Sequence, residues 1–303
     1  MKFGILLPVE GNVTEGVVNP KLALKVARRA EDLGYDSVWA GERMLLSKRL
    51  DPISLLGAVA SVTERVSLGT AVMIAPLKHP IILADQLASL DNISNGRLIA
   101  GFGVGADRIK QEYESVGVSF NDRGSRLDEC VSIMKQAWKG KIDFEGKHFR
   151  LSNLEMALKP KQKEGPPIFL GGAKKVSLKR VARYADGWMP IEASPSEYQT
   201  GYDKIKSYQD TQRTIERDLY ITLNIRENKE IAKEEAHRFL DTYYNVKFPS
   251  IDKMAFFGTV EDAVRRFEEY SSVGVERAIV RFASFGDQVN QVESFSEKVK
   301  SRF

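Results

Sequence analysis

The residues best suited to chemistry in this chain surround a pair of glycines. The sequence Gly171-Gly172-Ala173-Lys174 ends a short apolar run and leads directly into a helical pattern, with Ser177 in its first turn. The start of a helix offers unpaired backbone N–H groups and the positive end of the helix dipole, and both attract anions. We therefore predict a phosphate-binding loop here. The alternative is a plain strand-to-helix turn with solvated lysines.

Few other residues near the predicted strand ends can do chemistry on their own. Glu42 and Glu192 are the only carboxylates expected there, too few to hold a divalent metal without help. The histidines, His79, His148 and His237, lie far apart without metal-ligand spacing, so we predict no metal site. No lysine is placed for Schiff-base chemistry. We expect a site that holds a cofactor with its own chemistry.

A second glycine-rich segment, Gly101-Phe-Gly-Val-Gly-Ala106, fits a loose dinucleotide-binding pattern. However, it follows the fourth predicted strand, and no further strand ends near Asp122, where a ribose-binding carboxylate would be expected. We favour the simpler interpretation that the glycines let the backbone approach a ligand or a packed neighbour closely.

Alternating apolar runs and helical patterns determine where these residues lie. The apolar runs are rich in Val, Ile and Leu without clean alternation, which is typical of parallel strands buried on both faces. Eight strand–helix units favour an α/β fold of the (β/α)8 TIM-barrel type over an open sheet, and such barrels carry their chemistry at the carboxyl ends of the strands. The predicted strands are 3–8, 36–40, 66–73, 98–103, 168–171, 187–190, 220–225 and 278–282. The predicted helices are 20–33, 51–62, 80–96, 123–139, 176–185, 195–214, 230–244, 260–273 and 288–301.

Two segments do not fit the repeating pattern. Residues 140–166 have few helical signals and are expected to be an insertion that carries a small hairpin, and residues 245–258 are similarly irregular. The chain has no Ser/Gly linker or low-complexity tract, so we predict one domain over residues 1–303.

Composition excludes several classes of protein. The 303 residues include 45 Lys and Arg against 41 Asp and Glu, and the net charge of +4 is too weak to indicate a nucleic-acid partner. The single cysteine, Cys130, forbids an internal disulfide and suits a reducing compartment. No apolar run approaches the ~18 residues of a membrane span, and no signal-peptide pattern is present. We expect a cytoplasmic protein with no membrane partner.

Motifs spread over most of the chain resemble the bacterial luciferase-like superfamily of flavin- and deazaflavin-dependent (β/α)8 enzymes. They are Ala30-Glu-Asp-Leu-Gly-Tyr-Asp-Ser-Val-Trp39, Leu68-Gly-Thr-Ala-Val72, Pro76-Leu-Lys-His-Pro80, residues 87–97, 101–105, 123–129 and 166–172, Ala185-Asp-Gly-Trp188, Phe257-Gly-Thr-Val-Glu-Asp262 and Ser272-Val-Gly-Val275. Together they are specific for the superfamily and much less specific for substrate.

The resemblance implies roles for individual residues. It implies a non-proline cis peptide between Ala71 and Val72 beneath the cofactor ring, and a contact between Glu42 and the cofactor. It also implies that the cofactor's side chain lies along Gly103 and Gly105. The implied phosphate loop consists of Gly171, Gly172, Ala173 and Lys174, with Ser177 beside it.

The chain departs from the family pattern at two places. Many relatives carry Asp-His after the second strand, whereas this chain has Glu42-Arg43. Arg43 cannot act as a proton-transfer histidine, and its fixed charge would favour an anionic reduced ring or an acidic tail. The alternative for Glu42 and Arg43 is a local surface pair. Ala106 replaces the glutamate of a sugar-phosphate-oxidising branch. His79 is a further catalytic candidate, although capping the helix that begins at Pro80 would explain it equally well.

The leading hypothesis is an oxidoreductase that transfers a hydride between deazaflavin coenzyme F420 and a small organic substrate. The second is a two-component monooxygenase that uses reduced FMN and O2 and needs a separate reductase. The third is a non-catalytic flavin-binding protein. The resemblance also makes a homodimer the expected assembly.

Overall fold

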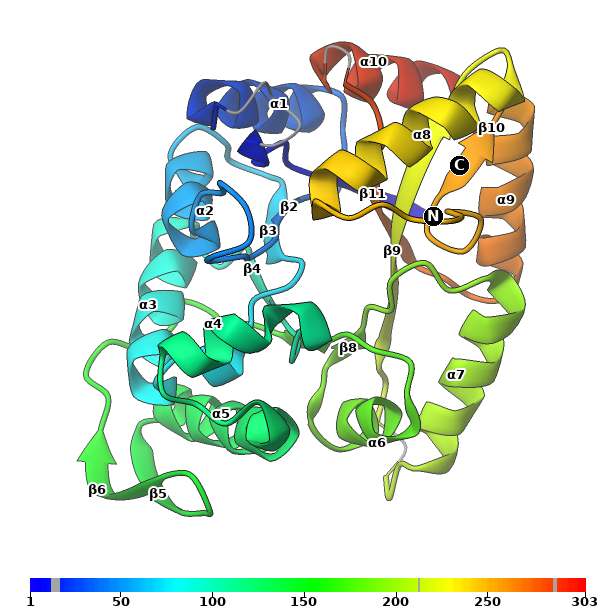
Figure 1. Cartoon of the computed structure of the whole chain (residues 1–303). Coiled ribbons are helices and arrows are strands. Elements are labelled where there is room, and N and C mark those ends of the chain that lie inside the picture. The colour runs from blue at the N-terminus through cyan, green and yellow to red at the C-terminus, as the bar shows by residue number, and fades with distance from the viewer. Residues whose placement is uncertain (12–16, 212, 286–287) are drawn as a thin grey trace.

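The computed structural model describes residues 1–11, 17–211, 213–285 and 288–303. The predicted TIM barrel is confirmed, because eight parallel strands form a closed ring. Figure 1 looks towards one end of this ring, with most helices around it. The barrel strands are β1 (Lys2–Leu6), β2 (Ser37–Ala40), β3 (Ser67–Thr70), β4 (Leu98–Phe102), β7 (Ile168–Leu170), β8 (Gly187–Trp188), β9 (Glu216–Ile225) and β11 (Arg277–Phe282).

The ring closes through β9, its seventh member in chain order. Neighbouring strands follow the order β11-β1-β2-β3-β4-β7-β8, and β9 joins both ends of this row by pairing with β11 and β8. Every one of these pairs is parallel, for example Leu6 opposite Trp39 and Trp39 opposite Gly69. All eight carboxyl ends therefore meet at one end of the barrel.

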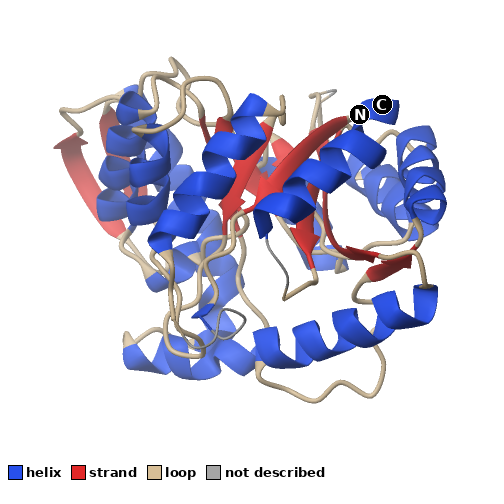
Figure 2. Ribbon diagram, turned by 90° about the horizontal axis from the view of Figure 1, so that it is seen from above, coloured by secondary structure: helices blue, strands red, loops and turns tan. Residues whose placement is uncertain are grey.

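Helices surround the strands, as the view from above in Figure 2 also shows. Their starts carry the expected signals: Asn19 and Asp51 cap the first two helices, and Ser194 forms a full capping box with Glu197. The helices are α1 (Pro20–Asp32), α2 (Pro52–Ala60), α3 (Pro80–Ile93), α4 (Lys110–Ser115), α5 (Arg123–Lys139), α6 (Lys175–Tyr184), α7 (Pro195–Ser207), α8 (Lys229–Tyr244), α9 (Val260–Ser272) and α10 (Gln288–Lys298).

Several predicted boundaries are wrong, three of them next to functional loops or to each other in sequence. The helix expected over 195–214 ends at Ser207, and the following strand begins at Glu216. The strand expected over 66–73 ends at Thr70, after which Met73 alone pairs with Phe102. The helix and the strand over 66–73 end earlier than predicted, whereas the strand at Glu216 begins earlier than the predicted 220.

The two irregular segments differ from each other. Residues 140–166 carry the predicted hairpin, formed by β5 (Lys141–Glu145) and β6 (Arg150–Glu155). The segment 245–258, expected to be irregular, ends in strand β10 (Phe256–Gly258), which pairs with the last residues of β9. A strand of three residues is too short to leave a periodic pattern in the sequence.

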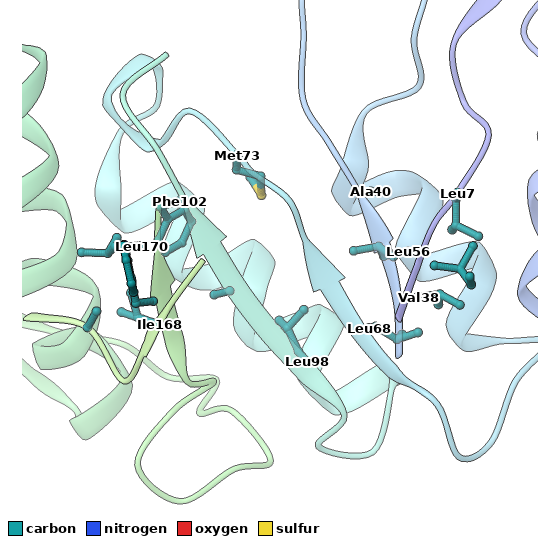
Figure 3. Close-up of a cluster of buried hydrophobic side chains, with 14 of the residues drawn as sticks. Leu7, Val38, Ala40, Leu56, Leu68, Met73, Leu98, Phe102, Ile168 and Leu170 are labelled. Atoms are coloured by element: carbon teal, nitrogen blue, oxygen red, sulfur yellow. The ribbon is translucent and has the colours of Figure 1, made fainter. Parts of the chain in front are cut away.

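The main core lies between the strands and the surrounding helices. Leu7, Val38, Leu68, Leu98 and Ile168 project outward from consecutive strands, and Figure 3 shows them with Leu56 of α2. These apolar contacts hold the ring in shape and leave its carboxyl end free for the loops that carry functional residues.

Candidate functional site

The interior of the barrel is filled by a cluster of buried side chains that includes the indole of Trp39. Trp39 is fully buried, and its Nε1 donates to Ser37 Oγ at 2.8 Å. Glycines on both flanking strands make room for it: a Cβ on Gly4 would lie 2.5 Å from Trp39 Nε1, and one on Gly69 would lie 2.0 Å from Trp39 Cε3. The barrel is therefore a packed core, and ligands are restricted to its carboxyl end.

The peptide bond between Ala71 and Val72, just beyond β3, is cis, as the family resemblance implies. Ala71 is buried against the interior cluster, and Val72 is partly exposed at its edge. These two residues form a small apolar surface at the open end of the barrel.

Gly103 and Gly105 follow the neighbouring strand β4. A Cβ on Gly103 would lie 2.8 Å from Val72 Cγ2, and a Cβ on Gly105 would lie 2.0 Å from Ile109 Cδ1. Gly105 also has a positive φ of 69°. The close neighbours of both glycines are thus side chains of this chain, which agrees with the packed-neighbour interpretation of this segment.

Glu42 reaches across the end of β3. Its Oε2 accepts from the Ile74 backbone N–H at 2.6 Å, its Oε1 accepts from Lys78 Nζ, and its own N–H donates to Val72 O. The carboxylate therefore holds the segment that follows the cis peptide. The alternative of a Glu42–Arg43 surface pair is wrong, since the ion-pair partner of Glu42 is Lys78.

Arg43 instead faces a tyrosine at the carboxyl end of α8. Its guanidinium carbon lies 5.4 Å from the centre of the Tyr244 ring, and Arg108 from the loop after β4 lies 4.2 Å from the same centre. Burial, then the nearby charge of Arg108, lowers the pKa of Arg43. The backbone N–H groups of Met44 and Leu45 donate to Glu112 Oε1 at 3.1 Å, which fixes the segment after Arg43.

A second arginine, Arg281 in β11, is buried between aromatic rings. Its guanidinium carbon lies 4.3 Å from the ring centre of Tyr243 and 5.3 Å from that of Tyr220. Its nitrogens donate to Thr222 Oγ1 and, at 3.3 Å, to Tyr244 Oη. Arg281 carries a charge in an interior where charges are normally paired.

The carboxylate of Glu10 and the guanidinium of Arg49 form a bidentate pair beside Tyr243. Arg49 Nη2 also donates to Tyr243 Oη at 2.5 Å. Burial raises the pKa of Tyr243, but the charges of Arg49, Arg281 and Arg43 outweigh it, so the net shift is downward. This tyrosine is held as a hydrogen-bond acceptor towards Arg49.

Glu192 follows β8 in a left-handed backbone conformation, with φ of 55°. Its Oε1 accepts from the Thr222 backbone N–H at 2.9 Å. Burial raises the pKa of this carboxyl to about 8, although the Arg281 charge and the Thr222 hydrogen bonds act in the opposite direction. A carboxyl that is protonated near neutral pH can donate a proton.

The predicted phosphate loop lies between β7 and α6. Gly172 has a positive φ of 94°, and its carbonyl accepts from Trp188 Nε1 at 3.0 Å, which ties the loop to the core. Residues 172–176 are exposed, and within the described ranges their backbone N–H groups have no hydrogen-bond partner. Lys174 is the N-cap of α6, and Ser177 lies in its first turn. The geometry fits an oxyanion.

His79 directly follows Lys78, the ion-pair partner of Glu42. It occupies the N-cap position of α3, but its side chain makes no capping hydrogen bond, so that alternative is wrong. The imidazole is exposed and packs edge-on against Phe149, 5.5 Å between ring centres. In the described part of the chain, no three His, Cys, Asp or Glu side chains gather as a metal site would require.

Sequence reasoning did not single out several residues that meet at this end of the barrel. Arg108 and Tyr244 come from segments far apart in the chain, and Figure 1 shows α4 and α8 crossing the same end of the barrel. Only the shared location after strand ends could have suggested Arg108, and no pattern distinguishes Tyr243 or Tyr244 from other helix residues. The residues missed are Glu10, Arg49, Arg108, Glu112, Tyr243 and Tyr244.

Known proteins with similar sequences include flavin-dependent and F420-dependent enzymes. The model of the luciferase-like monooxygenase family matches residues 1–290. The chain is 30% identical over 175 residues to the oxygenase component of the flavin-dependent trigonelline monooxygenase of Acinetobacter baylyi, covering 56% of this chain and 48% of that protein. It is 27% identical over 222 residues to the F420-dependent glucose-6-phosphate dehydrogenase of Amycolatopsis mediterranei, covering 65% and 64%. The chain spans about half the length of several curated relatives that it matches.

Solved structures share the fold over the whole chain. A structure of an F420-dependent secondary alcohol dehydrogenase in complex with an F420-acetone adduct matches with a TM-score of 0.82 at 21% identity, covering 99% of this chain and 98% of that one. At this identity the likeness concerns the fold alone. Among the residues described, no helix combines the length and apolar character needed to cross a bilayer.

Proposed function

Because the chain belongs to the luciferase-like monooxygenase family, we propose that it is an oxidoreductase that transfers a hydride between deazaflavin coenzyme F420 and a small organic substrate. The observation that carries this proposal is the shared position of two features at the carboxyl end of the barrel. These are the cis peptide Ala71–Val72 with its apolar surface and the exposed N–H groups of residues 172–176.

The residues present fit such a cofactor. The exposed loop Gly171-Gly172-Ala173-Lys174, with Ser177 in the first turn of α6, would hold a phosphate. Ala71 and Val72 would support the ring, and Gly103 and Gly105 would border the cofactor's side chain. When bound, the deazaflavin supplies the hydride chemistry, and the protein supplies position and a protected pocket.

We propose Glu42 and Arg43 as the residues nearest the reacting centre. Glu42 holds the segment after the cis peptide through Ile74 and Lys78, which fixes the surface on which a ring would rest. Arg43 supplies a permanent positive charge that favours an anionic group. His79 has no part in this proposal, because its exposed ring packs against the hairpin residue Phe149.

F420 is favoured over FMN by the relatives named as F420-dependent and by Arg43, which stands where many relatives have a histidine. The second candidate is a two-component monooxygenase that uses reduced FMN and O2 with a separate reductase. The relative named as a flavin-dependent oxygenase component supports it. A non-catalytic flavin-binding protein is less favoured, because the barrel keeps all eight strands.

The proposal extends to assembly and location. We propose a homodimer of single-domain chains, by analogy with the superfamily. A cytoplasmic location is consistent with one cysteine, Cys130, whose thiol is buried and unpaired.

Titration of the purified apoprotein with coenzyme F420 and, separately, with FMN tests the choice of cofactor. Absorbance and fluorescence changes of the deazaflavin at micromolar concentration are the expected result. Micromolar binding of FMN without detectable binding of F420 would reject the F420 proposal and favour the monooxygenase. Binding of neither would reject both.

A further inference from the structure

Three arginines converge on one tyrosine ring at the carboxyl end of the barrel. Their guanidinium carbons lie 4.2 Å (Arg108), 5.4 Å (Arg43) and 5.4 Å (Arg281) from the ring centre of Tyr244. The three side chains come from the loops after β2 and β4 and from β11, so the fold brings them together from separate units. Arg43 and Arg108 repel each other electrostatically, and an anion bound between such like charges would relieve the repulsion.

Among the described residues, no carboxylate forms an ion pair with these three arginines. Within the described ranges, none of the three arginines has an Asp or Glu oxygen within 4.0 Å, in contrast to Arg49, which is fully engaged by Glu10. Arg281 is only 4% exposed, and its hydrogen bonds go to the neutral hydroxyls of Thr222 and Tyr244. Burial and the charge of Arg108 lower the pKa of Arg43. For Arg281 burial acts in the same direction, but the surrounding tyrosines and Glu192 outweigh it, so its pKa is raised.

The cluster is open to a ligand. Arg108 is exposed, Arg43 is partly exposed, and both lie at the end of the barrel where Ala71 and Val72 are found. Residues 44–49, 241–242 and 245–247, which continue directly from Arg43 and Tyr244, line a groove of about 990 Å³. Met44, Leu45 and Val246 are exposed apolar side chains in this groove. The surface therefore combines a positive end with a groove of mixed lining, in which Ser47, Lys48 and Asp241 stand beside the apolar side chains.

We propose that Arg43, Arg108 and Arg281 form a carboxylate-binding subsite at the mouth of the barrel. A guanidinium is planar and matches the two oxygens of a carboxylate, and aromatic stacking on Tyr244 orients it without neutralising it. The carboxylate belongs either to the substrate, the rest of which lies along the groove, or to an acidic tail of the cofactor. The second source rests on the proposed function, whereas the subsite itself does not.

Isothermal titration calorimetry of the cofactor-free protein tests the subsite with benzoate and benzamide, which have the same shape but differ in charge. Benzoate is expected to bind at least tenfold more tightly than benzamide, and added NaCl should weaken only benzoate binding. Arg43→Gln and Arg108→Gln are each expected to reduce benzoate affinity tenfold or more. Arg150→Gln is the matched control, because Arg150 is an exposed hairpin residue and its variant should bind as the unmodified protein does.

Three results would overturn the subsite: equal affinities for benzoate and benzamide, unchanged benzoate affinity in correctly folded Arg43→Gln and Arg108→Gln, or loss of benzoate binding in Gly172→Asp. The last would place the anion at the phosphate loop instead. Far-UV circular dichroism and thermal melting establish that each variant is folded.

A second titration distinguishes the two sources, using coenzyme F420 with one glutamate and with five. If the tail is the ligand, the longer form binds more tightly, Arg108→Gln removes the difference, and benzoate competes with it. If the substrate is the ligand, tail length has no effect and benzoate binds to the cofactor-loaded protein. Failure of F420 and FMN to bind would reject the proposed function but would leave the benzoate result unaffected.

Discussion

Arg49 donates to Glu10 through two nitrogens at the open end of the barrel, with Nη2 lying 2.6 Å and Nε 2.9 Å from Glu10 Oε1. The two side chains are 5% and 2% exposed. The same residues also pair as an isolated antiparallel bridge. This ion pair fixes the segment after β1 against the segment that carries Arg43, and so connects two loops of the candidate site.

Replacing Glu10 with Gln should destabilise the protein strongly, because the buried charge of Arg49 loses its counter-ion. The expected loss in free energy of unfolding is about 3–5 kcal/mol, measured by urea denaturation. Glu145→Gln is the control, since Glu145 faces Arg150 at 4.0 Å on the exposed hairpin. That change should cost less than about 1 kcal/mol. Equal losses in the two variants would contradict this account of Glu10.

The sequence was sufficient for the barrel and for part of the site. Apolar runs, some of them ended by Pro or Gly, predicted every barrel strand, and the glycines before α6 predicted the exposed loop at Gly172. The partners of individual side chains were harder to predict from the sequence. Glu42 has Arg43 as its neighbour in sequence but pairs with Lys78, because both are brought to the end of β3 by the fold. The contact of Arg108 with Tyr244 depends in the same way on how α8 crosses the barrel, which local patterns do not encode.

Two glycine-to-alanine changes should have opposite effects on stability. In Gly69→Ala the new Cβ would lie 2.0 Å from Trp39 Cε3 in the centre of the barrel. Such overpacking should lower the free energy of unfolding by about 1–3 kcal/mol. Gly57 lies within helix α2 with no atom near its missing Cβ, so Gly57→Ala should raise it by about 0.5–1 kcal/mol. Chemical denaturation measures both, and a neutral Gly69→Ala would show that Trp39 can move.

The raised pKa of Glu192 should make the free energy of unfolding fall as pH rises. Its pKa is about 8 in the folded protein against an ordinary value of 4.5, so the folded state holds a proton that the unfolded state has released. The resulting stabilisation is complete below pH 4.5 and is lost as pH rises to 8, with a slope of at most about 1.4 kcal/mol per pH unit.

Glu192→Gln should remove this part of the pH dependence. The quantity to measure is the difference in free energy of unfolding between the variant and the unmodified protein from pH 5 to 8. Burial also raises the pKa of Asp218 to about 7, despite the charge of Arg277. Asp218 therefore adds its own pH dependence to the stability of both proteins, and taking the difference removes it. A difference that stays constant across this range would mean that Glu192 is ionised throughout.

Gly172→Asp should weaken binding of phosphorylated cofactors selectively. A carboxylate at this position would face the N–H groups of residues 172–176, and a Cβ there would lie 2.8 Å from Ser177 Oγ. We expect affinity for whichever of F420 and FMN binds the unmodified protein to fall at least tenfold, about 1.4 kcal/mol. Riboflavin, which lacks the phosphate, should lose little. Gly117→Asp provides the matched control, because Gly117 also has a positive φ, of 69°, but no atom near its missing Cβ. Equal losses for FMN and riboflavin would indicate a distorted ring pocket, and no loss in a folded Gly172→Asp would exclude this loop as the phosphate site.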